Sequence, residues 1–156
     1  MIEKKAIEFK NVDEILDYAI QAEEEARNFY SSWAKKVTTK AMQEVFESLA
    51  GEEGKHKEYL LGVKKGQSLK PSAKEIIDLK ISDYTVDIKA SSDIDYQDAL
   101  VLAMKKEKEA FRLYSSLSSM AISEEMKSTF KALAQEEAKH KLRLELIYDE
   151  EILREN

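Results

Sequence analysis

The sequence predicts an all-α protein in which four helices form a bundle built from two repeated helical hairpins. The 156-residue chain contains one proline and four glycines, so few positions break a helix. Apolar residues recur at spacings of three and four in four long segments, as on the buried face of amphipathic helices. The four segments form two copies of one pattern, and the second copy starts 84 residues after the first.

The first hairpin is expected over residues 11–65. Asn11 is a plausible N-cap for a helix that continues to about residue 37. A second helix is expected from Thr38 or Thr39 to about residue 65, where Gly66 ends it. Both helices carry an apolar stripe that one polar position interrupts near its middle.

Residues 66–94 interrupt the helical pattern and contain the single proline, Pro71. A short helix over Ala73–Leu79 fits the pattern, and it is followed by alternation that favours an extended segment. The alternating apolar residues are Tyr84, Val86 and Ile88. The segment is long enough to carry the chain back along a bundle, so we interpret it as the crossover between the hairpins.

The second hairpin is expected over residues 95–154. Asp95 would cap a third helix that ends near Ser118, and Ser123 would start a fourth that runs almost to the C-terminus. Residues 11–65 align with 95–149 without a gap and share 18 identities in 55 pairs. Two such hairpins joined by one long crossover predict a single domain over residues 1–156 with the topology of a four-helix bundle.

The chain has only two histidines, and each lies in a Glu-x-x-His motif at the centre of an apolar stripe. A further glutamate lies 30 residues before each motif, on the stripe of the preceding helix. Residues three apart on a helix point the same way and can reach one ion. The predicted metal ligands are Glu23, Glu53, His56, Glu107, Glu137 and His140.

Four carboxylates in an apolar core repel one another, and burial disfavours their charged form further. Two divalent ions would cancel the four charges, each ion taking one histidine, one terminal glutamate and shared bridging carboxylates. Oxygen donors with imidazole suit iron or manganese and tolerate zinc. A lone Glu-x-x-His is common on solvated helices, but six such residues on core stripes favour a metal site.

Other polar residues lie near these motifs. Tyr30 and Tyr114 follow Glu23 and Glu107 by two turns on the same face, so we expect their hydroxyl groups to orient a ligand carboxylate. The alternative is that both rings serve only as core. Glu52 and Glu136 point away from the stripe and are expected to be solvated or ion-paired.

Three glycines lie inside the second predicted helix, where each costs roughly 1 kcal/mol against alanine. Close approach of another helix is the simpler interpretation, and a mobile ligand helix around His56 is the alternative. The three residues are Gly51, Gly54 and Gly62.

Composition excludes several classes of function. The chain has no cysteine, which excludes disulfides and thiolate metal sites within it. A net charge of −6 argues against a nucleic-acid partner. No apolar run reaches the roughly 20 residues of a membrane span, and residues 1–10 do not form a signal peptide. We therefore expect a cytoplasmic protein.

The chain resembles the ferritin-like di-iron carboxylate family, and within it the rubrerythrin branch. The resemblance covers roughly residues 11–150 and is carried by two duplicated strings. The strings are Ala19-Ile20-x-x-Glu23-x-x-Ala26-x-x-x-Tyr30 and Leu49-Ala50-x-Glu52-Glu53-x-x-His56, with partners Ala103-Met104-x-x-Glu107-x-x-Ala110-x-x-x-Tyr114 and Leu133-Ala134-x-Glu136-Glu137-x-x-His140. The resemblance implies a ferritin-like fold, a non-haem centre of two iron ions with the six ligands above, and an oxidoreductase acting on peroxide or dioxygen. It also implies a homodimer.

The chain departs from the rubrerythrin pattern in two respects. Rubrerythrins add a rubredoxin domain whose four cysteines supply electrons, so this chain would need an external donor such as a redox protein. They also usually carry a further ligand glutamate at the position where this chain has Ala110. The rubrerythrin type of peroxidase cycle, in which a metal ion shifts its position, is therefore not implied for this chain. Two alternatives remain: a ferroxidase or iron-storage protein, and a structural bundle whose site holds zinc or nothing.

Overall fold

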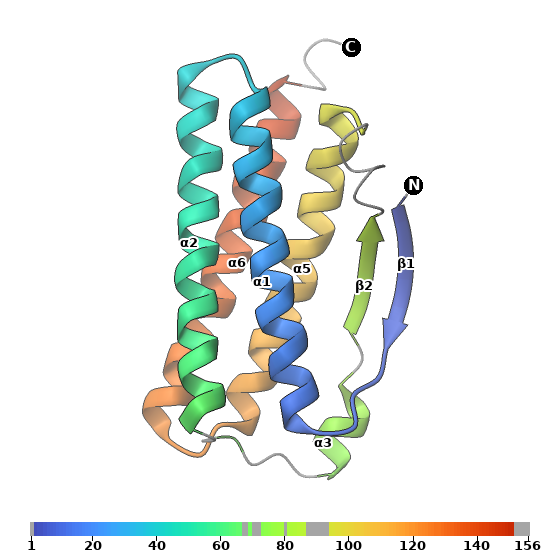
Figure 1. Ribbon diagram of the computed structural model, residues 1–156, viewed down its shortest axis with the longest axis vertical. Coiled ribbons are helices and arrows are strands. Elements are labelled where there is room, and N and C mark those ends of the chain that lie inside the picture. The colour runs from blue at the N-terminus through green and yellow to red at the C-terminus, as the bar shows by residue number, and fades with distance from the viewer. Residues whose placement is uncertain (1, 67–68, 70–72, 80, 87–93, 152–156) are drawn as a thin grey trace. The chain divides into compact units, whose positions relative to one another are not determined.

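The computed structural model describes residues 2–66, 69, 73–79, 81–86 and 94–151 (Figure 1). The chain divides into two compact units. One comprises Lys10–Lys70, and the other comprises Met1–Phe9 together with Pro71–Asn156. The elements in chain order are β1 (Ile2–Ile7), α1 (Val12–Lys36), α2 (Lys40–Gly66), α3 (Ala73–Asp78), β2 (Ile81–Val86), α5 (Tyr96–Met120) and α6 (Glu124–Glu151).

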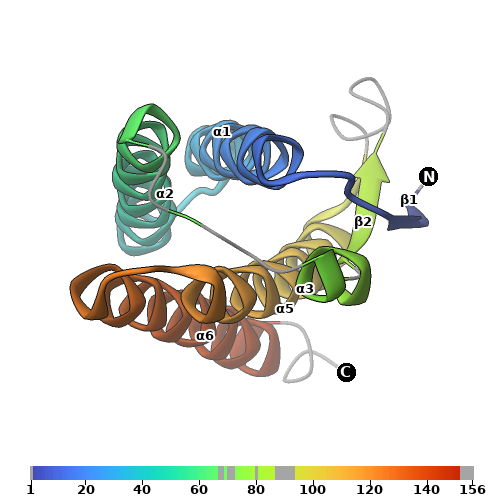
Figure 2. The same ribbon diagram turned by 90° about the horizontal axis from the view of Figure 1, so that it is seen from below.

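The unit Lys10–Lys70 is a helical hairpin of α1 and α2, which lie side by side in both views (Figures 1 and 2). Asn11 caps α1 as predicted, since its side chain accepts a hydrogen bond from the backbone N–H of Glu14 at 2.9 Å. The helix ends where Val37 turns extended, at φ −72° and ψ 149°. Thr39 caps α2, accepting from the N–H of Met42 at 3.2 Å.

The other unit contains the second hairpin, α5 and α6, which also lie side by side (Figures 1 and 2). Asp95 caps α5 by accepting from the N–H of Asp98 at 2.8 Å. Ser123 caps α6 by accepting from the N–H of Met126 at 3.1 Å. The predicted starts of both helices are thus confirmed, and α6 continues to Glu151.

A two-stranded antiparallel sheet packs beside α5 (Figure 1). β1 pairs with β2 so that Ile2 lies opposite Val86 and Ile7 opposite Ile81. The extended segment expected at Tyr84 and Val86 is confirmed, whereas its partner strand at the N-terminus was not predicted. Ile88 lies outside the described residues. The expected short helix is α3, which ends one residue earlier than predicted.

Both hairpins bury the apolar stripes that the sequence predicts. The core of the first hairpin includes Ile15, Leu49 and Leu60, and that of the second includes Leu100 and Leu117, all fully or almost fully buried. Large apolar side chains drive this packing, each contributing roughly 1.5–3 kcal/mol on burial. Within the described part of the chain, no helix combines the length and the apolar character that crossing a membrane would require.

Candidate metal centre

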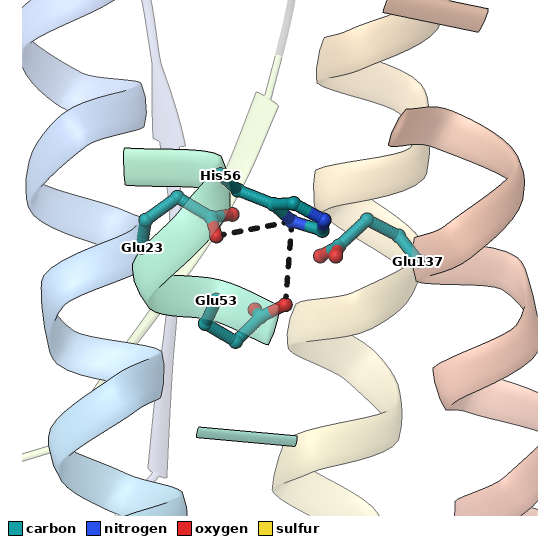
Figure 3. Close-up of side chains that lie close together, drawn as sticks. All are labelled: Glu23, Glu53, His56 and Glu137. Atoms are coloured by element: carbon teal, nitrogen blue, oxygen red, sulfur yellow. Dashed lines mark ion pairs between the residues drawn. The ribbon is translucent and has the colours of Figure 1, made fainter. Parts of the chain in front are cut away.

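The first hairpin places two carboxylates against one imidazole in its interior. Glu23 comes from α1, whereas Glu53 and His56 come from α2 (Figure 3). The Nδ1 atom of His56 lies 3.3 Å from Oε2 of Glu23 and 3.5 Å from Oε1 of Glu53. All three residues are at most 3% exposed. We call these residues the first triad.

The second hairpin repeats the arrangement. The Nδ1 atom of His140 lies 3.5 Å from Oε2 of Glu107 on α5 and 3.5 Å from Oε1 of Glu137 on α6. These three residues are also at most 3% exposed. We call Glu107, Glu137 and His140 the second triad. All six residues that the sequence singles out therefore lie in one of two matching clusters.

Helix geometry explains why each triad forms. Residues three apart lie on one face of a helix, about 4.5 Å apart along its axis, so the Glu-x-x-His motif directs both side chains the same way. The hairpin turn then brings the facing glutamate to the same level from the neighbouring helix. Apolar side chains one turn away hold that level in the core: Leu49 and Leu60 on α2, and Leu133 and Leu144 on α6, are all at most 8% exposed.

The donor atoms fit a divalent cation. Within each triad the three donor atoms lie within 4.8 Å of one another. Two donors about 2.1 Å from a common ion, at about 90–110°, are about 3.0–3.4 Å apart, which is close to the observed imidazole–carboxylate distances of 3.3–3.5 Å. Two buried carboxylates beside a neutral imidazole carry a charge of −2, which a divalent ion neutralises.

Tyr30 and Tyr114 occupy matching places in the two hairpins. The ring of Tyr30 stacks on Phe46, and that of Tyr114 stacks on Phe130, each with centroids 6.1 Å apart and an interplanar angle of 28°. Both tyrosines are at most 2% exposed. The core role of the rings is therefore clear, while an orienting role for their hydroxyl groups stays a prediction.

An ion-pair network that sequence reasoning missed links α1 to α2 next to the first triad. Lys57 donates to Glu24 at 2.8 Å, and Arg27 donates to the same carboxylate at 2.9 Å. The hydrogen bond from Lys57, followed by that from Arg27, holds the pKa of Glu24 below its usual range. The i,i+3 spacing of Glu24 and Arg27 is a signal in the sequence, but Lys57 lies 33 residues away.

The neighbouring acidic residues follow the expectation in part. Glu52 and Glu136 are half-buried rather than fully solvated, and each takes part in a polar interaction. Glu109, which the sequence did not single out, is only 7% exposed and pairs with Arg112 at 3.3 Å. Its place two residues after Glu107 turns it to the far side of α5, away from the direction of the triad.

Two hairpins that each place two buried carboxylates against a histidine define a ferritin-like carboxylate protein. The chain matches the model of the rubrerythrin family over residues 14–148, and it belongs to that family. No curated protein sequence matches it.

Two solved structures resemble the chain over most of its length. A crystal structure of a protein of Thermotoga maritima, described as a candidate ferritin-like diiron-carboxylate protein, matches with a TM-score of 0.70 and 21% identity, covering 93% of this chain and 98% of that one. A hypothetical protein of Pyrococcus furiosus matches with a TM-score of 0.69 and 32% identity, covering 89% of each chain. The ferritin-like fold predicted from the sequence is thereby confirmed.

Proposed function

We propose that the two triads bind a pair of iron ions and that the protein is an oxidoreductase which reduces peroxide or dioxygen. The observation that carries this proposal is the duplicated buried triad, with imidazole–carboxylate distances of 3.3–3.5 Å in both hairpins. Membership of the rubrerythrin family supports the choice of iron. Electrons would come from an external donor, because the chain has no cysteine to form a thiolate iron site of its own.

The charge of the site supports two ions per chain. The six residues supply four carboxylates and two imidazoles, so two divalent ions leave no net charge in the core. Oxygen donors with imidazole suit iron and manganese and accept zinc, so the donor set narrows the metal without fixing it. Full burial of all six side chains makes an empty site costly, which favours a resident metal.

The chain's own residues would have three roles in the reaction. The two histidines and four glutamates would hold the ions, which when ferrous supply the electrons for cleaving an O–O bond. Reduction of one hydrogen peroxide to two waters takes two electrons and two protons. Tyr30 and Tyr114 would orient ligand carboxylates, and the apolar side chains around each triad, such as Leu60 and Leu144, would exclude bulk water.

Ala110 stands at the position where rubrerythrins usually have a further ligand glutamate. This residue is a half-buried alanine one turn after Glu107, so it offers no carboxylate there. We propose that Glu107, Glu137 and His140 would hold an ion without the additional glutamate that rubrerythrins usually have.

Rapid mixing of the ferrous protein with peroxide tests the proposed function. The full chain is loaded anaerobically with two equivalents of Fe²⁺ and mixed with one equivalent of hydrogen peroxide while the optical spectrum is followed. We expect fast, stoichiometric oxidation and repeated turnover after a reductant is added. Oxidation no faster than that of free Fe²⁺ would overturn the proposal.

Matched variants connect that result to the triads. Glu137→Ala removes a triad carboxylate, whereas Glu136→Ala removes the half-buried neighbour that points away from the apolar stripe. Fast oxidation should be lost in the first variant and kept in the second. Equal rates in both would show that the reaction takes place elsewhere. Growth of an iron mineral without reductant-driven turnover would instead support iron storage.

A further inference from the structure

The turn between α1 and α2 carries a patch of positive charge (Figure 1). Lys35 and Lys36 end α1, Lys40 begins α2, and all three side chains are exposed. We call these three lysines the basic turn. Residues 28–43 contain them and no acidic residue, although the whole chain has a net charge of −6. The basic turn is therefore opposite in charge to the chain that carries it.

Helix stability does not account for all of the basic turn. A positive charge at the C-terminal end of a helix is favourable, which explains Lys35 and Lys36 at the end of α1. Lys40 is different, because it is the first residue of α2, where the helix dipole favours an acidic side chain. The repeat has Glu124 at the corresponding place. Lys40 thus opposes the helix dipole, which favours a role in binding.

The chain's single tryptophan lies at the basic turn. Trp33 is only 8% exposed, and Nζ of Lys36 lies over its ring, 4.7 Å from the centroid. The repeat has Leu117 at this position, so a hairpin of this kind does not require an indole there. An oxidisable ring therefore lies directly beneath a surface lysine in the first hairpin.

The same face of α1 leads from Trp33 to the first triad. At 100° per residue, Glu23, Tyr30 and Trp33 fall within about 80° of one another around the helix. Glu23 lies ten residues before Trp33, which is about 15 Å along the axis. All three side chains are buried. Two buried aromatic rings thus lie on the stretch of α1 between the triad and the basic turn, where they can divide an electron transfer into shorter steps.

We propose that the basic turn, together with Trp33, docks an acidic one-electron carrier protein and is the place where electrons enter the chain. This inference rests on the proposed function, which requires an external donor. The chain as a whole repels an acidic carrier, so attraction at the basic turn orients the encounter. Two one-electron transfers supply the two electrons that reduce one hydrogen peroxide to two waters. Three exposed lysines form a small surface, so the complex should be weak and sensitive to salt.

Carbodiimide cross-linking of the full chain, as purified, to a small acidic [2Fe–2S] ferredoxin tests the docking. The reagent joins lysine ammonium groups to carboxylates that they contact, and mass spectrometry of the product shows which lysines meet the carrier. We expect links from Lys35, Lys36 and Lys40 that disappear at high salt. Links mainly from other lysines, or no links at low salt, would overturn the proposal. Neither outcome depends on metal in the triads.

Charge reversal at matched positions tests the same contact by affinity. Quenching of Trp33 fluorescence by a ferredoxin without tryptophan gives the dissociation constant. Lys36→Glu and Lys40→Glu should each raise it by about tenfold, whereas Lys65→Glu should leave it unchanged. Lys65 is the matched control for Lys36, because both are exposed in the last turn of a helix. Circular dichroism confirms that each variant is folded, and equal constants in all three variants would contradict the docking site.

Reduction of the oxidised, iron-loaded chain separates this inference from the proposed function. Dithionite, a small reductant, should reduce the wild type and Trp33→Phe equally fast. Reduced ferredoxin should reduce Trp33→Phe about tenfold more slowly than the wild type. Equal rates with ferredoxin would show that Trp33 takes no part in electron entry. Failure of dithionite to reduce the wild type would overturn the proposed function instead, while the cross-links would still decide the docking.

Discussion

Glu53 is a single residue whose buried carboxylate would serve metal binding but lower the stability of the metal-free protein. Its side chain is 1% exposed and faces His56 within a negatively charged cluster. We predict that Glu53→Gln raises the free energy of unfolding of the metal-free protein by about 1 kcal/mol or more, because it removes a buried charge. The same variant should lose most of the stabilisation that metal gives to the wild type.

Thermal unfolding with and without added Fe²⁺ under anaerobic conditions measures both effects. Glu52→Gln is the control, because Glu52 is the half-buried neighbour that points away from the stripe. Its effect on the free energy of unfolding should be the same with and without metal, because Glu52 is not one of the triad residues. If Glu53→Gln destabilised the protein equally with and without metal, the residue would be structural and not a ligand.

Substitution of Tyr30 and Tyr114 by phenylalanine distinguishes the packing role of each ring from the role of its hydroxyl group. Each ring stacks on a buried phenylalanine, so Tyr→Phe keeps the packing and removes only one oxygen. We predict a stability loss of at most about 1.5 kcal/mol, together with a changed optical spectrum and a slower oxidation of the iron-loaded protein. An unchanged spectrum and rate in both variants would show that the hydroxyl groups do not orient the ligands.

The sequence could predict the six triad residues because each is a polar side chain at a fixed helical spacing within an apolar stripe. The structure brings them together as expected in each hairpin. The sequence could not reveal that Lys57 on α2 pairs with Glu24 on α1, because that pairing depends on which residues of the two helices lie at the same level along the hairpin. The burial of Glu109 was also missed, because its partner Arg112 looks like an ordinary surface residue.

At the scale of elements, α2 contains glycines that its fold does not require. We interpreted these glycines as sites of close helix approach, and this is wrong at two of them. Apart from its chain neighbours and the nearby backbone of α2 itself, a Cβ at Gly51 or Gly62 would meet no atom of the described residues within 4 Å, whereas one at Gly54 would lie 3.4 Å from Cδ of Arg27. Because an alanine side chain would fit at Gly51 and Gly62, glycine brings no packing advantage there and adds only its conformational cost in a helix.

Substitution of these glycines should therefore stabilise the protein. We predict that Gly51→Ala and Gly62→Ala each raise the free energy of unfolding by about 1 kcal/mol, and that the two gains add because the sites are far apart. Chemical denaturation measures the effect, and Gly54→Ala should gain less because Arg27 must adjust. If Gly51→Ala instead lowered the free energy of unfolding, α2 would require glycine at this position for a contact that this structure does not show.

The network of Glu24, Lys57 and Arg27 predicts a pH dependence for the contact between α1 and α2. Because the folded state lowers the pKa of Glu24, its contribution to stability is present above the ordinary value of 4.5 and is lost as the pH falls through the lowered value. Glu24→Gln should therefore lower the melting temperature at neutral pH and have no effect at strongly acidic pH. Exposed Glu47 lies outside the network, so Glu47→Gln is the control.

Long helices were predictable as elements because caps and periodicity are local. Asn11, Asp95 and Ser123 each cap a helix where the sequence placed a cap. The strand β1 was not predictable, since its partner β2 lies about 80 positions further on and a two-stranded sheet leaves little periodic signal. Charged residues in Ile2–Ile7 also obscure the alternation.

At the scale of the whole molecule, the repeat explains why one chain holds two equivalent triads. Each compact unit contains one hairpin and one complete triad, at matching positions 84 residues apart. The family membership and the ferritin-like fold agree with the prediction from the duplicated motifs. The identity of the metal was not predictable, because carboxylate and imidazole donors suit several divalent ions.

Metal analysis of the chain purified without added metal, together with its optical spectrum, tests whether the two triads hold iron. We expect two iron ions per chain and an absorption spectrum that bleaches on reduction. Metal should be lost in Glu53→Ala and in Glu137→Ala but not in Glu52→Ala. A chain that holds no metal, or zinc alone, or that keeps two ions in the triad variants, would show that the triads are not an iron site.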